Sequence, residues 1–109
     1  SIMEETDFCL RTVRAGFRLV YDPRASLTHL CLPMGGCRAP RFEHWLFWHA
    51  HNGILFMLRH AWKKALPSFI FWRMARFTLF SFEKGSLPLL GIGLLGLVRG
   101  VSTHLSSRE

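Results

Sequence analysis

The sequence predicts an α/β piece at residues 1–39, followed by an α-helical extension at residues 40–109 that associates with a membrane. Residues 32–40 carry two prolines and two adjacent glycines, which interrupt regular structure and mark the boundary. The second half holds nine Lys or Arg against three acids, whereas the first half holds five Arg against four acids. All four tryptophans also lie in the second half. Positive charge combined with large apolar rings favours an anionic membrane surface as partner.

A helix is predicted from Glu4 to Ala15, because its first turn is acidic and its later turns carry arginines. Asp7 precedes Arg11 by four residues, which is the favourable order for a helical ion pair. Gly16 is able to adopt the left-handed backbone that ends a helix. The expected buried stripe of this helix consists of Cys9, Leu10 and Val13.

Two extended segments are predicted after this helix. Residues 18–21 alternate between Arg18 or Val20 on one side and Leu19 or Tyr21 on the other, as in a short strand. The Asp-Pro pair at residues 22–23 must end that strand, because proline restricts the residue before it. Residues 25–30 form the second extended segment. A helix and two strands together give the α/β assignment.

Three helices are predicted in the second half. Aromatic and apolar residues recur at helical intervals over residues 41–64, with Gly53 as a weak point that costs about 1 kcal/mol relative to alanine. Pro67 interrupts the chain before a second helix over residues 68–83. A Lys-Gly-Ser turn follows, and Pro88 suits the first turn of a third helix that runs to about residue 105.

The apolar content of the last two helices predicts membrane association. Apolar residues cover most of the circumference of the helix at 68–83, which is more than one core-facing stripe needs. Residues 87–98 form an unbroken apolar run of twelve, whereas about 20 residues are needed to span a bilayer. Charged residues flank this run, so an interfacial or re-entrant hairpin is expected rather than a crossing.

Cysteines and histidines indicate neither a disulfide framework nor a zinc site. The three cysteines are odd in number and lack Cys-x-x-Cys spacing, so free thiols in a reducing compartment are expected. No cluster of acidic or cysteine co-ligands accompanies the histidines of the second half, which are interpreted as polar-face or interfacial residues: His44, His49, His51 and His60. Gly96 and Gly100 form a single Gly-x-x-x-Gly motif that is compatible with close helix packing.

One joint pattern in the first half resembles a known family. The pattern consists of Glu4-Glu5-Thr6-Asp7-Phe8-Cys9-Leu10-Arg11, Ala15-Gly16-Phe17-Arg18-Leu19-Val20-Tyr21-Asp22-Pro23-Arg24-Ala25 and His29. It resembles the C-terminal part of family 2 glycosyltransferases over residues 2–36. The resemblance implies the C-terminal edge of a GT-A domain, a nucleotide-binding α/β fold that transfers a sugar from a nucleotide-diphosphate donor with inversion. Its acceptors are glycans or lipid-linked molecules.

The resemblance also implies roles for individual residues. Glu5 would be the general base, with Glu4 as its first-acid neighbour and Asp7 as a further acid; the family more often has Asp where Glu5 stands. A carboxylate at this place can remove the proton of an acceptor hydroxyl as the new bond forms. Gly35 and Gly36 resemble an acceptor-side loop, and Arg11 is assigned to the same acceptor side.

His29 would help to hold a divalent metal, Mn²⁺ or Mg²⁺, on the donor diphosphate in the complete enzyme. Imidazole suits Mn²⁺ better, because Mg²⁺ prefers oxygen ligands. The 109 residues contain no Asp-x-Asp motif for the remaining metal contacts. The chain also begins at Ser1, almost directly at the acidic helix. We therefore expect a C-terminal fragment that is inactive alone and belongs to a peripheral enzyme at the cytoplasmic face of a bacterial membrane.

Two other interpretations remain open. A non-catalytic basic amphipathic module that docks on anionic lipid would explain the second half equally well. Acids in the first turn of a helix are also common for purely electrostatic reasons, so each acid taken alone favours a structural role. Nucleic-acid binding ranks last, because the chain has the charge but no recognisable motif.

Overall fold

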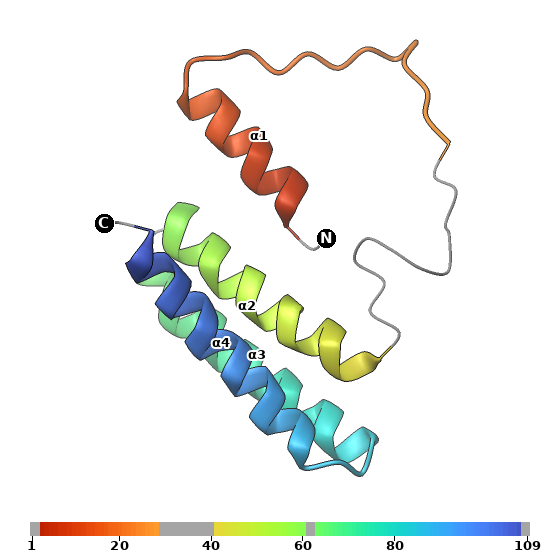
Figure 1. Cartoon of the computed structure of the whole chain (residues 1–109), viewed down its shortest axis with the longest axis vertical. Helices are drawn as coiled ribbons and strands as arrows, with labels where there is room; N and C mark the ends of the chain where they lie inside the picture. Colours follow the sequence, from red (N-terminus) through yellow and green to blue (C-terminus); the bar gives the residue numbers. More distant parts are fainter. Residues whose placement is uncertain (1–2, 29–40, 61–62, 108–109) are drawn as a thin grey trace.

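Helices make up all the regular structure in the part of the chain that the computed structural model describes, residues 3–28, 41–60 and 63–107. The elements are α1 (Glu4–Arg14), α2 (Phe42–His60), a 3-10 turn η1 (Lys63–Ala65), α3 (Leu66–Glu83) and α4 (Pro88–Ser106). Three long helices, α2, α3 and α4, lie together, and α1 lies against one end of α2 (Figure 1). The predicted helices are confirmed, although Pro67 lies in the first turn of α3 rather than before it.

The α/β prediction for the first half is wrong for the described residues. The two predicted strands, residues 18–21 and the described part of residues 25–30, are absent, and residues 17–28 run away from the helices (Figure 1). A strand needs a neighbour to pair its backbone N–H and C=O groups, and no described segment lies beside this one. Its large apolar side chains are exposed, up to 88% for Leu27. The predicted turn is present, because the Ala25 amide donates to the Asp22 carbonyl at 3.1 Å.

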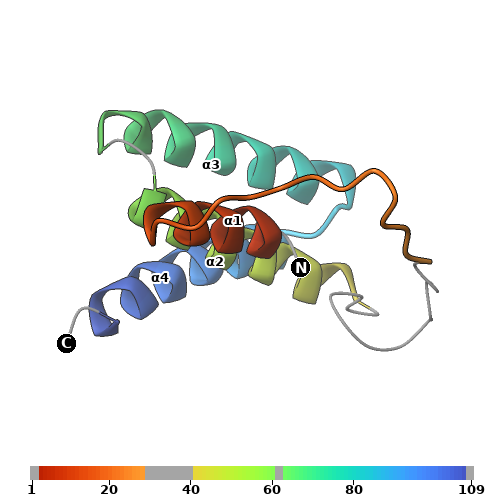
Figure 2. The same ribbon diagram turned by 90° about the horizontal axis from the view of Figure 1, so that it is seen from above.

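A small apolar core joins the three long helices. Side chains from all three helices are buried in it: Leu46, Ala50 and Ile54 of α2, Phe77 of α3, and Leu89 and Leu97 of α4. Helices α2 and α4 run side by side in the same direction (Figure 2). Helix α3, which connects them in the chain, runs in the opposite direction and lies further from α2 than α4 does. The core therefore depends most on the contact between α2 and α4.

Glycines on one face of α4 allow this close contact. A Cβ added at Gly96 would lie 2.5 Å from the Phe47 carbonyl oxygen and 2.8 Å from the Ala50 Cβ, and one at Gly100 would lie 2.6 Å from the His51 carbonyl oxygen. Real Cβ atoms do not approach other atoms so closely, so only glycine fits at either position. The Gly-x-x-x-Gly motif thus packs α4 directly on the α2 backbone.

The first helix is held by polar contacts. No residue of α1 belongs to the buried apolar core. Leu10 and Val13 of its expected buried stripe are exposed, so that prediction is wrong for those two residues. Gly16 ends the helix with φ of 86°, as predicted. The position of α1 therefore depends on its hydrogen bonds and ion pairs with α2.

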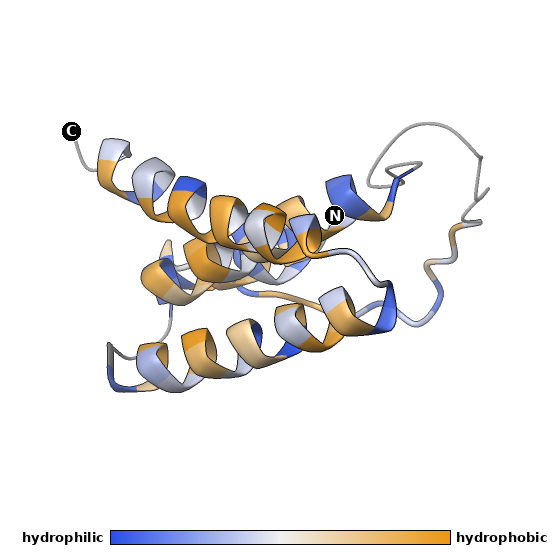
Figure 3. Ribbon diagram, turned by 90° about the horizontal axis from the view of Figure 1, so that it is seen from below, coloured by the Kyte–Doolittle hydropathy of each residue, from blue (hydrophilic) through white to orange (hydrophobic). Residues whose placement is uncertain are grey.

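Much apolar surface remains on the outside of α3 and α4. Figure 3 shows apolar residues along both helices. The large apolar side chains exposed on them are Ile70, Phe71, Trp72, Leu79, Phe82, Leu94, Leu95, Val98, Val101 and Leu105. Among the described residues, α4 alone is long and apolar enough to cross a membrane, but the core helix of a globular protein passes the same test.

Candidate functional site

Asp7 joins α1 to the end of α2. Its carboxylate accepts from Arg11 Nε at 2.8 Å, which confirms the predicted helical pair, and from His60 Nε2 at 2.7 Å. Arg59 Nη1 lies 3.7 Å from the same carboxylate. The side chains of Asp7 and His60 are only 15% and 4% exposed. Asp7 is therefore a largely buried member of a charge cluster and not a free acid.

Arg14 defines the tautomer of His60 in this cluster. Its Nη1 lies 2.8 Å from His60 Nδ1 and 3.2 Å from the Arg59 carbonyl oxygen. Because a guanidinium only donates hydrogen bonds, His60 Nδ1 must accept. His60 Nε2 consequently carries the ring proton and donates a hydrogen bond to the Asp7 carboxylate. The chain of donors from Arg14 through His60 to Asp7 orients α1 on α2.

The surroundings of Asp7 lower its pKa. Burial has the largest effect and raises the pKa of this carboxyl, but the hydrogen bond from His60 and the charges of Arg11 and Arg59 together outweigh it. A carboxyl whose pKa is lower in the folded state stabilises the fold above its ordinary value of 3.8. That stabilisation is lost as the pH falls below this value and Asp7 is protonated.

The Asp7→Asn variant tests this cluster. We expect α1 to separate from α2, because asparagine keeps the shape but removes a charge whose hydrogen bonds contribute about 1.5–3 kcal/mol. Amide hydrogen exchange of residues 4–14 should then become at least about tenfold faster, while α2 and α4 keep their protection. Asp22→Asn is the control, because Arg24 is the one described residue that pairs with Asp22, in an exposed turn. Unchanged exchange in α1 would show that other contacts hold this helix.

The other two acids lie at the exposed start of α1. Glu4 and Asp7 line a small pocket of about 90 Å³, whose other walls come from Asn52, Leu55, Phe56 and Arg59 of α2. Glu5 is exposed and makes no hydrogen bond or ion pair with any described residue. The three predicted acids thus separate into a structural residue, Asp7, a pocket residue, Glu4, and an accessible carboxylate, Glu5.

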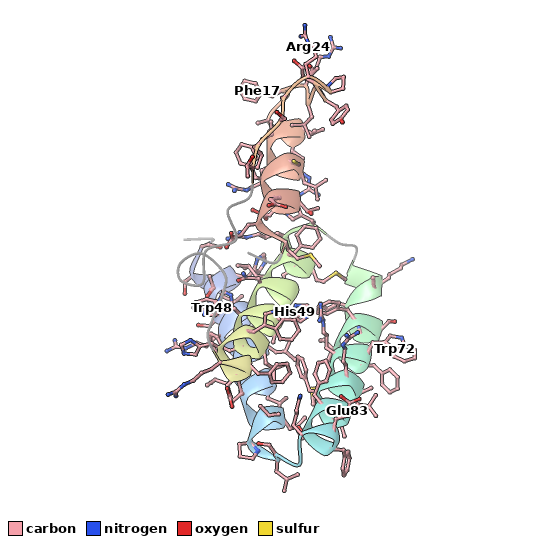
Figure 4. All side chains as sticks on the ribbon, turned by 90° about the vertical axis from the view of Figure 1, so that its right-hand side faces the viewer. Phe17, Arg24, Trp48, His49, Trp72 and Glu83 are labelled. Atoms are coloured by element: carbon pink, nitrogen blue, oxygen red, sulfur yellow. The ribbon has the colours of Figure 1, made fainter. Side chains whose placement is uncertain are left out.

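A second and larger site is a groove of about 780 Å³ between α2 and α3. Its aromatic and apolar walls come from Trp45, Phe69, Trp72, Ala75, Leu79 and Phe80, and its polar residues are His49, Arg73, Arg76 and Glu83. Figure 4 shows His49 between the two helices, with Glu83 nearer the end of α3. Sequence reasoning assigned these aromatic residues to a membrane-facing surface and did not identify a groove.

His49 and Arg73 are in contact within the groove. Arg73 donates through Nη1 to His49 Nε2, and the imidazole stacks on Trp45 at a centroid distance of 4.7 Å. Burial, followed by the charges of Arg73 and Arg76, lowers the pKa of His49 to about 4. His49 is therefore neutral at pH 7 and accepts the hydrogen bond. Burial, followed by the charge of Arg76, also lowers the pKa of Arg73.

Several predicted site residues cannot be placed. His29, Gly35 and Gly36 lie outside the described residues, so their metal and acceptor assignments stay predictions. Arg11 contacts Asp7 and is otherwise exposed. Within residues 3–28, 41–60 and 63–107, no three His, Cys, Asp or Glu side chains form a group that could hold a metal ion. The described residues thus offer no metal centre.

Comparison with known proteins does not assign the chain. It matches no family model, no curated protein and no solved structure. Function must therefore be argued from the residues and their arrangement.

Only part of these sites could be predicted from local sequence patterns. The Asp7–Arg11 pair follows from helical spacing, but the contact with His60 joins residues 53 apart. Helical spacing likewise puts Arg73 and Arg76 on one side of α3. Their approach to His49 requires the antiparallel packing of α3 on α2, which no local pattern specifies.

Proposed function

We propose that this chain forms the acceptor side of an inverting family 2 glycosyltransferase, peripheral to the cytoplasmic face of a bacterial membrane. The observation that supports the proposal most is the contrast between Asp7 and Glu5 on α1. The Asp7 carboxylate pairs with Arg11, Arg59 and His60. The Glu5 side chain is exposed and forms no ion pair or hydrogen bond with the described residues. An anchored helix that presents an accessible carboxylate suits a general base.

The chemistry requires such an arrangement. Inversion places the acceptor hydroxyl opposite the leaving diphosphate, so the base must reach the acceptor and not the donor. A carboxylate within hydrogen-bond distance removes the hydroxyl proton as the acceptor oxygen bonds to the anomeric carbon. Fixing α1 through Asp7 would hold Glu5 in one position, which lowers the entropy lost in reaching the transition state.

The proposed enzyme needs residues for the donor sugar beyond those described. No Asp-x-Asp motif occurs in the 109 residues. The described residues also contain no cluster of three or more His, Cys, Asp or Glu side chains that could hold a metal ion. His29 remains the proposed contribution of this chain to a metal on the donor. We assign no catalytic step to that metal and derive the role of α1 from its own carboxylates.

A transfer assay tests the proposal. Membranes from cells that express the complete coding sequence are incubated with labelled nucleotide-diphosphate sugars, and the labelled products are isolated. We expect transfer from at least one donor, with the opposite anomeric configuration in the product. Retention of configuration, or no transfer from any donor in a broad panel, would contradict the proposal.

A second candidate function is a membrane-binding module without catalysis. It is favoured by the exposed rings of α3, including Phe71, Trp72 and Phe82 at 65%, 68% and 75% exposure, beside a chain of net charge +7. Co-sedimentation of the 109-residue chain with anionic vesicles at low and high salt tests it. Binding at low salt with no transferase activity of the complete protein would favour the module, and no binding would exclude it.

A further inference from the structure

The groove between α2 and α3 carries positive charge that no described carboxylate neutralises. Arg73 and Arg76 both line it, and neither forms an ion pair within the described parts of the chain. Glu83 also lines the groove but does not pair with either arginine. A half-buried arginine is normally paired, because an isolated charge is costly to remove from water. The groove therefore favours an anionic ligand.

Both arginines lie over aromatic rings that line the groove. The Arg73 guanidinium lies 5.0 Å from the centre of the Phe69 ring, and the Arg76 guanidinium lies 5.2 Å from the centre of the Phe80 ring. His49 accepts one Arg73 hydrogen bond, which leaves further N–H groups of that guanidinium for another partner. Arginine binds phosphate through two parallel hydrogen bonds, so a phosphate group is an anion that these guanidinium groups can hold.

The walls of the groove indicate that the ligand also has an apolar part. Trp45, Phe69, Trp72, Leu79 and Phe80 surround the charged residues. An inorganic anion would leave these rings in contact with water, whereas an acyl chain would cover them. Trp72 and Leu79 line the groove and are also 68% and 60% exposed, so its apolar wall continues onto the outer surface of α3. A lipid could thus enter it from a bilayer on which α3 rests.

We propose that this groove binds an anionic phospholipid, with its phosphate on Arg73 and Arg76 and the start of its acyl chain against the aromatic walls. This is a defined headgroup site and differs from general attraction between a basic surface and a charged membrane. The proposal does not rest on glycosyl transfer, because the groove and the acids of α1 are formed by different residues.

Titration with short-chain lipids tests the site without a bilayer. The purified 109-residue chain is mixed with dihexanoyl phosphatidic acid below its micelle concentration, and binding is followed by tryptophan fluorescence and calorimetry. Dihexanoyl glycerol has the same chains without phosphate, and inorganic phosphate has no chains. We expect each of these two controls to bind at least about tenfold more weakly than the phospholipid.

Arginine variants then locate the site. Arg76 is exposed, so Arg76→Gln should leave the fold intact and weaken phospholipid binding about tenfold. Arg73→Lys keeps the charge but loses the paired hydrogen bonds, and should weaken binding similarly. Arg99→Gln is the matched control, because it removes an exposed arginine from α4 and should change binding less than twofold. Circular dichroism checks that each variant is folded.

Three results would overturn the proposal. The first is equal weakening of phospholipid binding by Arg76→Gln and Arg99→Gln, which would indicate general electrostatic attraction and no defined headgroup site. The second is binding of inorganic phosphate as tight as that of the phospholipid, which would indicate a free-anion site. The third is equal binding of dihexanoyl glycerol, which would show that the arginines do not bind phosphate.

Discussion

Replacing Gly96 by alanine is expected to lower the free energy of unfolding by about 3 kcal/mol. The added Cβ would lie 2.5 Å from the Phe47 carbonyl oxygen and 2.8 Å from the Ala50 Cβ. Neither atom is the end of a flexible side chain, so α4 as a whole must move away from α2. That movement would loosen the core around Ala50 and Leu97, which are both buried. Urea unfolding followed by circular dichroism measures the change.

Gly91 provides a matched control for Gly96, because both glycines lie in α4. A Cβ at Gly91 would meet no atom within 4 Å. Gly91→Ala should therefore raise stability by about 0.5–1 kcal/mol, since alanine is the better helix former. Alanine is thus expected to lower the free energy of unfolding at Gly96 and to raise it at Gly91. Equal effects of the two variants would show that α4 does not pack on α2 through Gly96.

The helices could be predicted from the sequence because their signals are local. Acids precede arginines in α1, Gly16 ends it, and Pro88 begins α4. Even the close packing of α4 was indicated by Gly96 and Gly100, although the motif does not specify which helix it contacts. The structure identifies that helix as α2.

The strand prediction failed for a non-local reason. Residues 18–21 alternate as a strand does, but alternation describes only which side each side chain would face. A strand forms when a neighbouring strand pairs its backbone, and the described residues provide none. Val20 and Tyr21 are instead 80% and 87% exposed. Pairing of Asp7 with His60 was equally beyond a local pattern, because it depends on how α1 docks on α2.

In the proposed transferase, replacing Glu5 by glutamine is expected to reduce kcat for sugar transfer by about 10³-fold. Glutamine has nearly the same shape as glutamate but cannot accept the proton of the acceptor hydroxyl. Donor affinity should change less than twofold, because the base acts on the acceptor side. Radiolabel transfer at saturating donor measures kcat, and equilibrium binding of the nucleotide sugar measures donor affinity.

Two further variants separate a catalytic role of Glu5 from a structural one. Glu43→Gln removes another exposed acid near the start of a helix, α2, and should leave kcat unchanged. Glu5→Asp keeps a carboxylate one methylene shorter and should retain part of the activity, because the family resemblance allows Asp at this position. If Glu5→Gln retained more than a tenth of the activity, Glu5 would not be the base. Glu4, which lines the pocket beside Asp7, would then be the next first-turn carboxylate to replace.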